Sequence, residues 1–171
     1  SAFYPLMTSD YFNLSAMYGS AVELSFAAGM MAASLLFSGV WKAERKLRVS
    51  FMGLLGMGAA SVLCGAIPPV FAGWFFFASA CAVLGAAGNV HLIPLTAYMQ
   101  ETVEPEKMGR AFSVLTLISS VTMPVGLLFS SPIAEKAGVN IWFLISGLSM
   151  TALTTAVIIH YVMRYRRKNQ V

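Results

Sequence analysis

Five long apolar stretches dominate the sequence, and short polar segments separate them. Each stretch has about the 20 residues that an α-helix needs to cross roughly 30 Å of hydrocarbon, although the second is near the lower limit. Unbroken apolar runs such as Phe75–Phe77 lack the alternation of a β-barrel strand, and an open sheet leaves costly unpaired backbone groups in lipid. The pattern therefore predicts membrane helices over residues 15–41, 49–67, 70–99, 111–133 and 140–163.

The polar segments between the apolar stretches contain helix-ending and charged residues. Pro68 and Pro69 separate the second stretch from the third, because consecutive prolines end a helix. Charged segments at 42–48, 101–110 and 134–140 separate the others, and a basic tail at 164–168 follows the last. We expect an all-α membrane protein, a polytopic bundle of about five transmembrane helices within residues 15–171. Residues 1–14 then lie outside the bundle.

Composition supports a lipid-solvated chain. Hydrophobic residues make up 58% of the sequence and charged residues 11%, and the mean hydropathy is +0.74. A soluble domain has about 25% charged residues. A chain so poor in charge cannot cover a water-facing surface, so the lipid bilayer is its expected surrounding.

The distribution of positive charge predicts the orientation in the membrane. With five helices, ten of the eleven Lys and Arg residues fall on one side, and Lys136 alone falls on the other. Cytoplasmic loops carry the excess of Lys and Arg, so we expect the C-terminus in the cytoplasm and the N-terminus outside. Topology explains the net charge of +4 without a nucleic-acid partner.

Three stretches together resemble one transporter family. Ala21–Met30 is followed by the basic segment, Pro105–Ser113 is similar to a cytoplasmic loop that leads into a helix, and Met123–Gly138 has a Gly- and Pro-rich helix end with a short outer loop. In order and spacing they resemble the major facilitator superfamily, specifically bacterial drug exporters of the macrolide-efflux type. The resemblance spans nearly the whole chain and agrees with the topology predicted from charge.

The resemblance implies that this chain is part of a larger carrier. The five helices correspond to the eighth through twelfth of the family, and residues 1–14 to the loop and outer tip of the preceding helix. A family half has six helices, and the substrate binds between two halves near the membrane midplane. The resemblance therefore implies a partial six-helix half that works with the missing N-terminal helices in a bacterial inner membrane.

The function implied is secondary active export of amphipathic drugs or related small molecules, with protons as the counter-transported ion. A nutrient or metabolite carrier of the same fold is one alternative, although charged or sugar substrates would need more cavity Arg, Asp or Gln than these helices show. A non-transporting membrane scaffold subunit is another. No recognisable enzyme motif, metal-ligand set or cofactor motif occurs in the sequence, and an intramembrane hydrolase is a distant third possibility. We interpret the two cysteines, Cys64 and Cys81, as small buried hydrophobic residues.

Glu23 is the only acidic residue inside an expected helix, roughly 12 Å from the outer end of that helix. Intramembrane carboxylates are costly and are functional candidates; the alternative is a structural acid, bonded to a neighbouring segment or wet at the interface. Met30 and Ser34 follow on the same helical face and are further cavity candidates. The cavity position of this helix is implied by the resemblance.

On the third helix, Asn89 and Thr96 fall on one stripe, which makes both of them cavity candidates. His91 lies about 200° around the helix from Asn89, so the two cannot face one cavity. The alternative role for Asn89 is a hydrogen bond between helices. A buried His91 bonded to a backbone carbonyl is favoured over a proton-carrying one.

The last candidates lie at helix-interrupting residues. Pro94 and Pro124 each free a backbone carbonyl and are hinge candidates, with Gly126 beside Pro124. Thr122 belongs to the small polar face there and could line the cavity. Small residues at four-residue spacing predict close helix packing: Ser25/Gly29/Ala33, Gly56/Ala60 and Ala78/Ala82/Ala86.

Overall fold

The computed structural model describes residues 3–39 and 46–168, and the regular elements in these ranges are all helical. A short N-terminal segment consists of α1 (Phe3–Leu6) and the π-helical turn η1 (Met7–Tyr11). Five long helices follow: α2 (Ala16–Gly39), α3 (Lys46–Ala66), α4 (Phe71–Thr102), α5 (Pro105–Ala137) and α6 (Val139–Lys168). All five are long and apolar enough to cross a membrane. The predicted fold class is confirmed.

The helices extend beyond the apolar stretches, because apolarity marks the part in lipid while a helix can continue into water. Most of the polar segment expected at 101–110 is helical, since α4 continues to Thr102 and α5 begins at Pro105, in the first helical turn that proline tolerates. The turn expected at 134–140 is reduced to Gly138, whose φ of 96° ends α5. Residues 40–45, which hold most of the basic segment expected at 42–48, lie outside the described residues.

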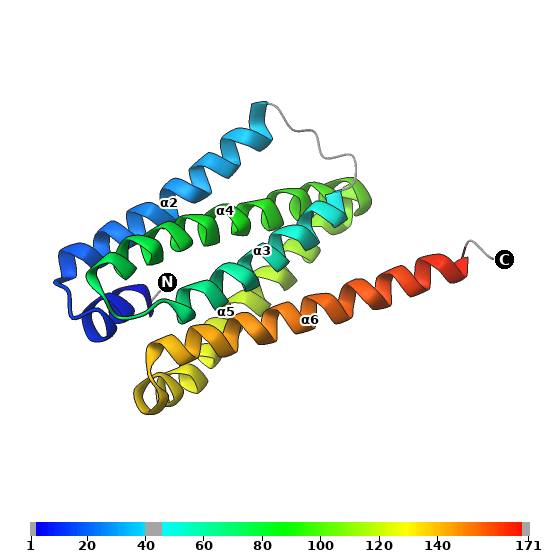
Figure 1. Cartoon of the computed structure of the whole chain (residues 1–171). Helices are drawn as coiled ribbons and strands as arrows, with labels where there is room; N and C mark the ends of the chain where they lie inside the picture. Colours follow the sequence, from blue (N-terminus) through cyan, green and yellow to red (C-terminus); the bar gives the residue numbers. More distant parts are fainter. Residues whose placement is uncertain (1–2, 40–45, 169–171) are drawn as a thin grey trace.

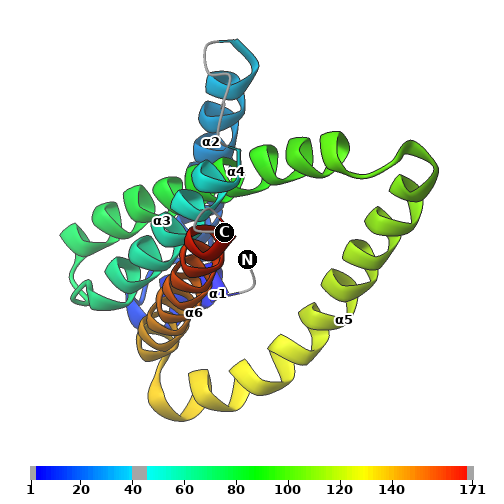
Figure 2. The ribbon, with the colours of Figure 1, turned by 90° about the vertical axis from the view of Figure 1, so that its right-hand side faces the viewer.

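Four of the long helices form a bundle, in which α4 packs against α2 and α3, and α3 packs against α6. Figure 1 shows the N-terminal segment, the α3–α4 turn and the α5–α6 turn at one end, here called the near end. The α4–α5 turn and the C-terminal end of α6 lie at the far end, toward which α2 diverges from α4. Figure 2 shows α5 standing apart from α2, α3 and α4, and none of the described residues in its most apolar 18-residue stretch is buried.

The aromatic and sulfur-containing core lies toward the near end. Phe77 is fully buried there, with ring centroids 5.6 Å from Phe12 and 6.0 Å from Phe143. Met7 of η1 is also fully buried, and the Tyr11 hydroxyl donates a hydrogen bond to the Ile67 carbonyl at 3.0 Å. The N-terminal segment is therefore part of the packed core rather than a detached loop.

Glycines allow α2 and α4 to make backbone contact. A Cβ on Gly29 would overlap the Ala82 carbonyl, and a Cβ on Gly85 would overlap the Phe26 carbonyl. Two of the small-residue stripes expected from the sequence, those of Gly29 and Ala82, thus meet each other. Close approach of this kind is the main source of packing between helices in lipid, where water exclusion contributes little.

Glycines also allow close backbone contact between α3 and α4 and between α3 and α6. A Cβ on Gly53 of α3 would lie 2.5 Å from the backbone nitrogen of His91 in α4. A Cβ on Gly65 would lie 2.6 Å from the backbone carbonyl oxygen of Asn140 in α6. At the far end, Lys46 and Glu101 form an ion pair between the start of α3 and the end of α4. The bundle is therefore held by glycine contacts along its length and by a charged pair at one end.

Candidate functional site

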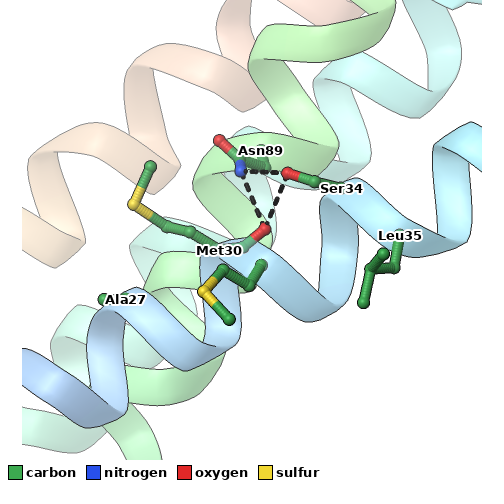
Figure 3. Close-up of a pocket in the computed structure, with 6 residues that line it drawn as sticks. Ala27, Met30, Ser34, Leu35 and Asn89 are labelled. Carbon is green, nitrogen blue, oxygen red and sulfur yellow. Dashed lines mark hydrogen bonds between the residues drawn. The ribbon is translucent and has the colours of Figure 1, made fainter.

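Where α2 diverges from α4, the two helices border a pocket of about 480 Å³ (Figure 3). Asn89 is the contribution of α4. The residues from α2 share one helical face, because they recur at spacings of three and four: Ala27, Met30, Met31, Ser34 and Leu35. Four of these five are apolar, so the pocket offers an apolar wall with a small polar centre.

The polar centre is a closed set of hydrogen bonds. The Asn89 Nδ2 atom donates to the Met30 carbonyl oxygen at 2.8 Å and to Ser34 Oγ at 2.8 Å. Ser34 Oγ in turn donates to the same Met30 carbonyl at 2.9 Å. Figure 3 shows the three bonds as a triangle between the helices. Asn89 therefore ties α4 to α2 at the position where they begin to separate.

The triangle leaves one polar atom of Asn89 turned away from α2. Both hydrogens of the amide nitrogen point to α2, so the carbonyl oxygen Oδ1 points in the opposite direction (Figure 3). Among the described residues, Oδ1 has no hydrogen-bond partner, and the side chain is only half buried. Asn89 lines the pocket, so its Oδ1 is an acceptor that the described residues leave unused beside the pocket.

Three of the residues singled out from the sequence, Met30, Ser34 and Asn89, meet in this site. Glu23 does not line the pocket. It is exposed on α2, one helical turn before Ala27 on the same face, and makes no hydrogen bond or ion pair with another described residue. Met31 and Leu35 were not singled out, although each directly follows a candidate and so lies on the same broad face.

The two threonine candidates do not join the site. Thr96 Oγ1 donates to the Leu92 carbonyl at 2.8 Å, and Thr122 Oγ1 donates to the Ile118 carbonyl at 2.7 Å. Each hydroxyl is therefore satisfied within its own helix, as is common for threonine in helices. Thr122 is exposed on α5, away from the α2–α4 pocket.

The hinge candidates lie inside continuous helices. Pro94 is buried within α4, and Pro124 lies within α5. Gly126 faces open space, since a Cβ there would have no neighbour within 4 Å. Bending at these residues remains an untested expectation.

One polar contact and one pair of buried thiols between α3 and α4 were not identified from the sequence. His91 faces α3, with Nδ1 2.7 Å from Ser50 Oγ and 3.2 Å from the Ser50 carbonyl oxygen, while Asn89 faces α2. This agrees with the expected separation of the two side chains around α4. The thiols of Cys64 and Cys81 are fully buried in one hydrophobic core cluster. Periodicity places each residue on a face but does not name its partner.

A second pocket, of about 640 Å³, lies at the near end between the N-terminal segment and the α5–α6 turn. Its lining includes the exposed carboxylate of Asp10, which accepts a hydrogen bond from Ser9 Oγ at 2.9 Å. In the part of the chain that the structure describes, no three His, Cys, Asp or Glu side chains gather into a metal-binding group.

Comparison with known proteins gives a consistent family. The family model of the Major Facilitator Superfamily matches residues 1–170. The chain is 35% identical over 147 residues to Macrolide efflux protein A of Streptococcus pyogenes, a match that covers 86% of this chain and 36% of the relative. It is 32% identical over 127 residues to Macrolide efflux protein A of Enterococcus faecalis, covering 74% of this chain and 39% of the relative. The chain thus spans little more than a third of these relatives. No solved structure matches.

Proposed function

Because the chain belongs to the Major Facilitator Superfamily, we propose that it forms one wall of the substrate path of a carrier that exports amphipathic drugs. The observation that carries the proposal is the α2–α4 pocket, which combines an apolar lining with the single amide of Asn89. The resemblance found in the sequence is confirmed, and the chain is a multi-pass membrane protein. The names of these relatives make a macrolide the first substrate to test.

The chemistry of the pocket suits an adaptable apolar substrate. Met30 and Met31 have flexible, polarizable side chains, which fit irregular apolar surfaces and bind varied ligands. Small-molecule sites combine a mostly apolar lining with a few placed polar groups. A sugar or a charged metabolite would need more polar partners than Asn89 and Ser34 supply.

A complete transport cycle needs helices beyond those in this chain. Carriers of this family place the substrate between two halves and alternate its exposure between the two sides. The chain corresponds to 36% of the Streptococcus pyogenes relative, so we assign it one side of that path. The remaining helices of the same carrier supply the other side, and this chain by itself moves no substrate.

Proton antiport is the coupling that we propose, with Glu23 as the proton carrier. Its support is position: Glu23 lies within α2, on the stripe that continues into Ala27, Met30 and Ser34. A carboxylate next to an apolar substrate path can exchange a proton when the path opens to one side. The ten-to-one split of Lys and Arg supports an N-terminus outside and a C-terminus in the cytoplasm of a bacterial inner membrane.

Filling the pocket tests the proposal. In the complete carrier, Met31→Trp places an indole in the pocket, whereas Leu24→Trp makes a similar change on α2 outside it; the two native side chains are 64% and 71% exposed. Cells that lack their own exporters should accumulate several-fold more radiolabelled macrolide with Met31→Trp than with Leu24→Trp, at equal expression. Equal accumulation in the two variants would contradict a substrate role for the pocket and would favour a scaffold function.

A further inference from the structure

We propose that Asn89 makes the α2–α4 pocket selective for substrates that bring a hydrogen-bond donor, such as a hydroxyl or a primary ammonium group. Ligands whose polar group is only an acceptor, above all carboxylates and phosphates, are disfavoured. The inference rests on the proposed function and specifies which chemical class of amphipathic substrate the pocket accepts.

The first step is that the orientation of the Asn89 amide is fixed. A backbone carbonyl only accepts hydrogen bonds, so the Met30 carbonyl, at 2.8 Å, must face the amide nitrogen and not Oδ1. A flipped amide would bring two acceptor oxygens together in a site of low dielectric, where such repulsion is strong. Oδ1 is therefore held on the side away from α2 (Figure 3).

The second step is that the described residues of the pocket offer no spare donor. The two amide hydrogens of Asn89 are used by Met30 and Ser34, and the single hydroxyl hydrogen of Ser34 is used by Met30. The other lining side chains are apolar. The polar capacity that these groups leave unused is all acceptor capacity: Oδ1 of Asn89 and one lone pair of Ser34 Oγ.

The third step concerns charge around the pocket. Neither α2 nor α4 contains a Lys or Arg residue within its described span, and His91 faces α3. Glu23 continues the same face of α2 toward the near end and adds acceptor character. An anion in the pocket would thus lose its hydration without gaining a donor or a counter-charge, which is the costly way to bury a charge. A donor group, by contrast, meets Oδ1.

Three probes with one apolar body separate these cases: pyrenebutylammonium, its N-trimethyl analogue and pyrenebutyrate. The first two carry the same charge and differ in N–H donors, and the third is an anion. Pyrene fluorescence reports the polarity around the ring, so binding to the purified complete carrier in detergent is measured by titration. We expect about tenfold tighter binding of pyrenebutylammonium than of its trimethyl analogue, the size of one hydrogen bond to a neutral acceptor. Pyrenebutyrate should bind most weakly.

Variants assign the preference to Oδ1. Asn89→Leu removes the acceptor and should reduce the ratio between the two cations to about twofold or less. Ser25→Ala is the matched control, because it removes a hydroxyl of α2 that bonds to the Ala21 carbonyl of its own helix and lies outside the pocket. Its ratio should stay near the wild-type value. Asn89→Ala also leaves no side-chain acceptor and is smaller, so it replaces Asn89→Leu if that variant does not fold.

The outcomes distinguish this inference from the proposed function. A wild-type protein that binds the two cations equally, or an Asn89 variant that keeps the tenfold ratio, would overturn the inference while Met31→Trp still blocks efflux. Conversely, a ratio that depends on Asn89, together with normal efflux by Met31→Trp, would support selective binding and reject the transport role.

Discussion

Replacing Gly85 by alanine is predicted to push α2 away from α4 and to destabilise the bundle. A Cβ on Gly85 would overlap the Phe26 carbonyl oxygen and would lie 3.0 Å from the carbonyl carbon and 3.3 Å from Met30 Cγ. The nearest atoms belong to the backbone of α2, which cannot rotate out of the way as a long side chain can. The whole helix must therefore move.

The magnitude follows from ordinary contact distances. A carbon atom approaches a carbonyl oxygen to about 3.3 Å, so α2 must retreat by about 1 Å. Such a movement would stretch the 2.8 Å bond from Asn89 to the Met30 carbonyl beyond hydrogen-bonding distance. Overpacking costs about 1–3 kcal/mol, and a lost hydrogen bond between membrane helices costs about 0.6 kcal/mol on average. We expect a loss of roughly 2–4 kcal/mol in the free energy of unfolding.

The chain provides both a matched control and a reporter. A Cβ on Gly88, three residues further along α4, would have no neighbour within 4 Å, so Gly88→Ala should leave stability unchanged or slightly higher. The two native cysteines are fully buried and become reactive on unfolding. A maleimide dye that fluoresces on reaction therefore follows thermal unfolding in detergent. Equal melting temperatures for Gly85→Ala and Gly88→Ala would refute the close α2–α4 contact.

Three further predictions concern coupling, packing and topology. In the complete carrier, Glu23→Gln should reduce drug efflux by about tenfold or more at unchanged melting temperature; near-normal efflux with the same pH dependence would refute a proton role. A membrane-permeant oxidant such as iodine should join Cys64 to Cys81, since both thiols are fully buried in the same core cluster of α3 and α4; two thiols still titratable after denaturation would contradict this α3–α4 contact. In intact cells, an impermeant maleimide should label Asp10→Cys but not Lys107→Cys, and the reverse pattern would overturn the proposed orientation.

Helix number was predictable because the bilayer fixes the length of apolar sequence that a helix needs. Helix ends were harder to predict. The extension of α4 to Thr102 and the start of α5 at Pro105 lie in polar sequence, where hydropathy does not distinguish helix from loop. The position of α5 apart from α2, α3 and α4 was not predictable either (Figure 2). A lipid-facing helix and a helix that awaits a neighbour are equally apolar.

The site was predictable to the level of helical faces. The face of Met30 and Ser34 was recognised, and so was the separation of Asn89 from His91, because both follow from the turn of a helix. Their partners were not, because periodicity does not say which helices meet. A hydroxyl on the predicted face need not take part in the site. Thr96 donates to a carbonyl of its own helix, whereas Asn89 directs both of its amide hydrogens to α2.

The glycine contacts and the pocket are parts of a single α2–α4 interface. Gly29 and Gly85 bring the backbones together at Ala82 and Phe26, and the helices diverge toward the far end (Figure 1). Asn89 lies one turn beyond Gly85 and spans the widening space with its hydrogen bonds. The depth at which the glycines end therefore sets where the pocket begins, and the amide that closes the contact also presents Oδ1 to it. A substitution that loosens the glycine contact should consequently alter ligand selectivity as well as stability, since it releases the amide whose orientation the selectivity requires.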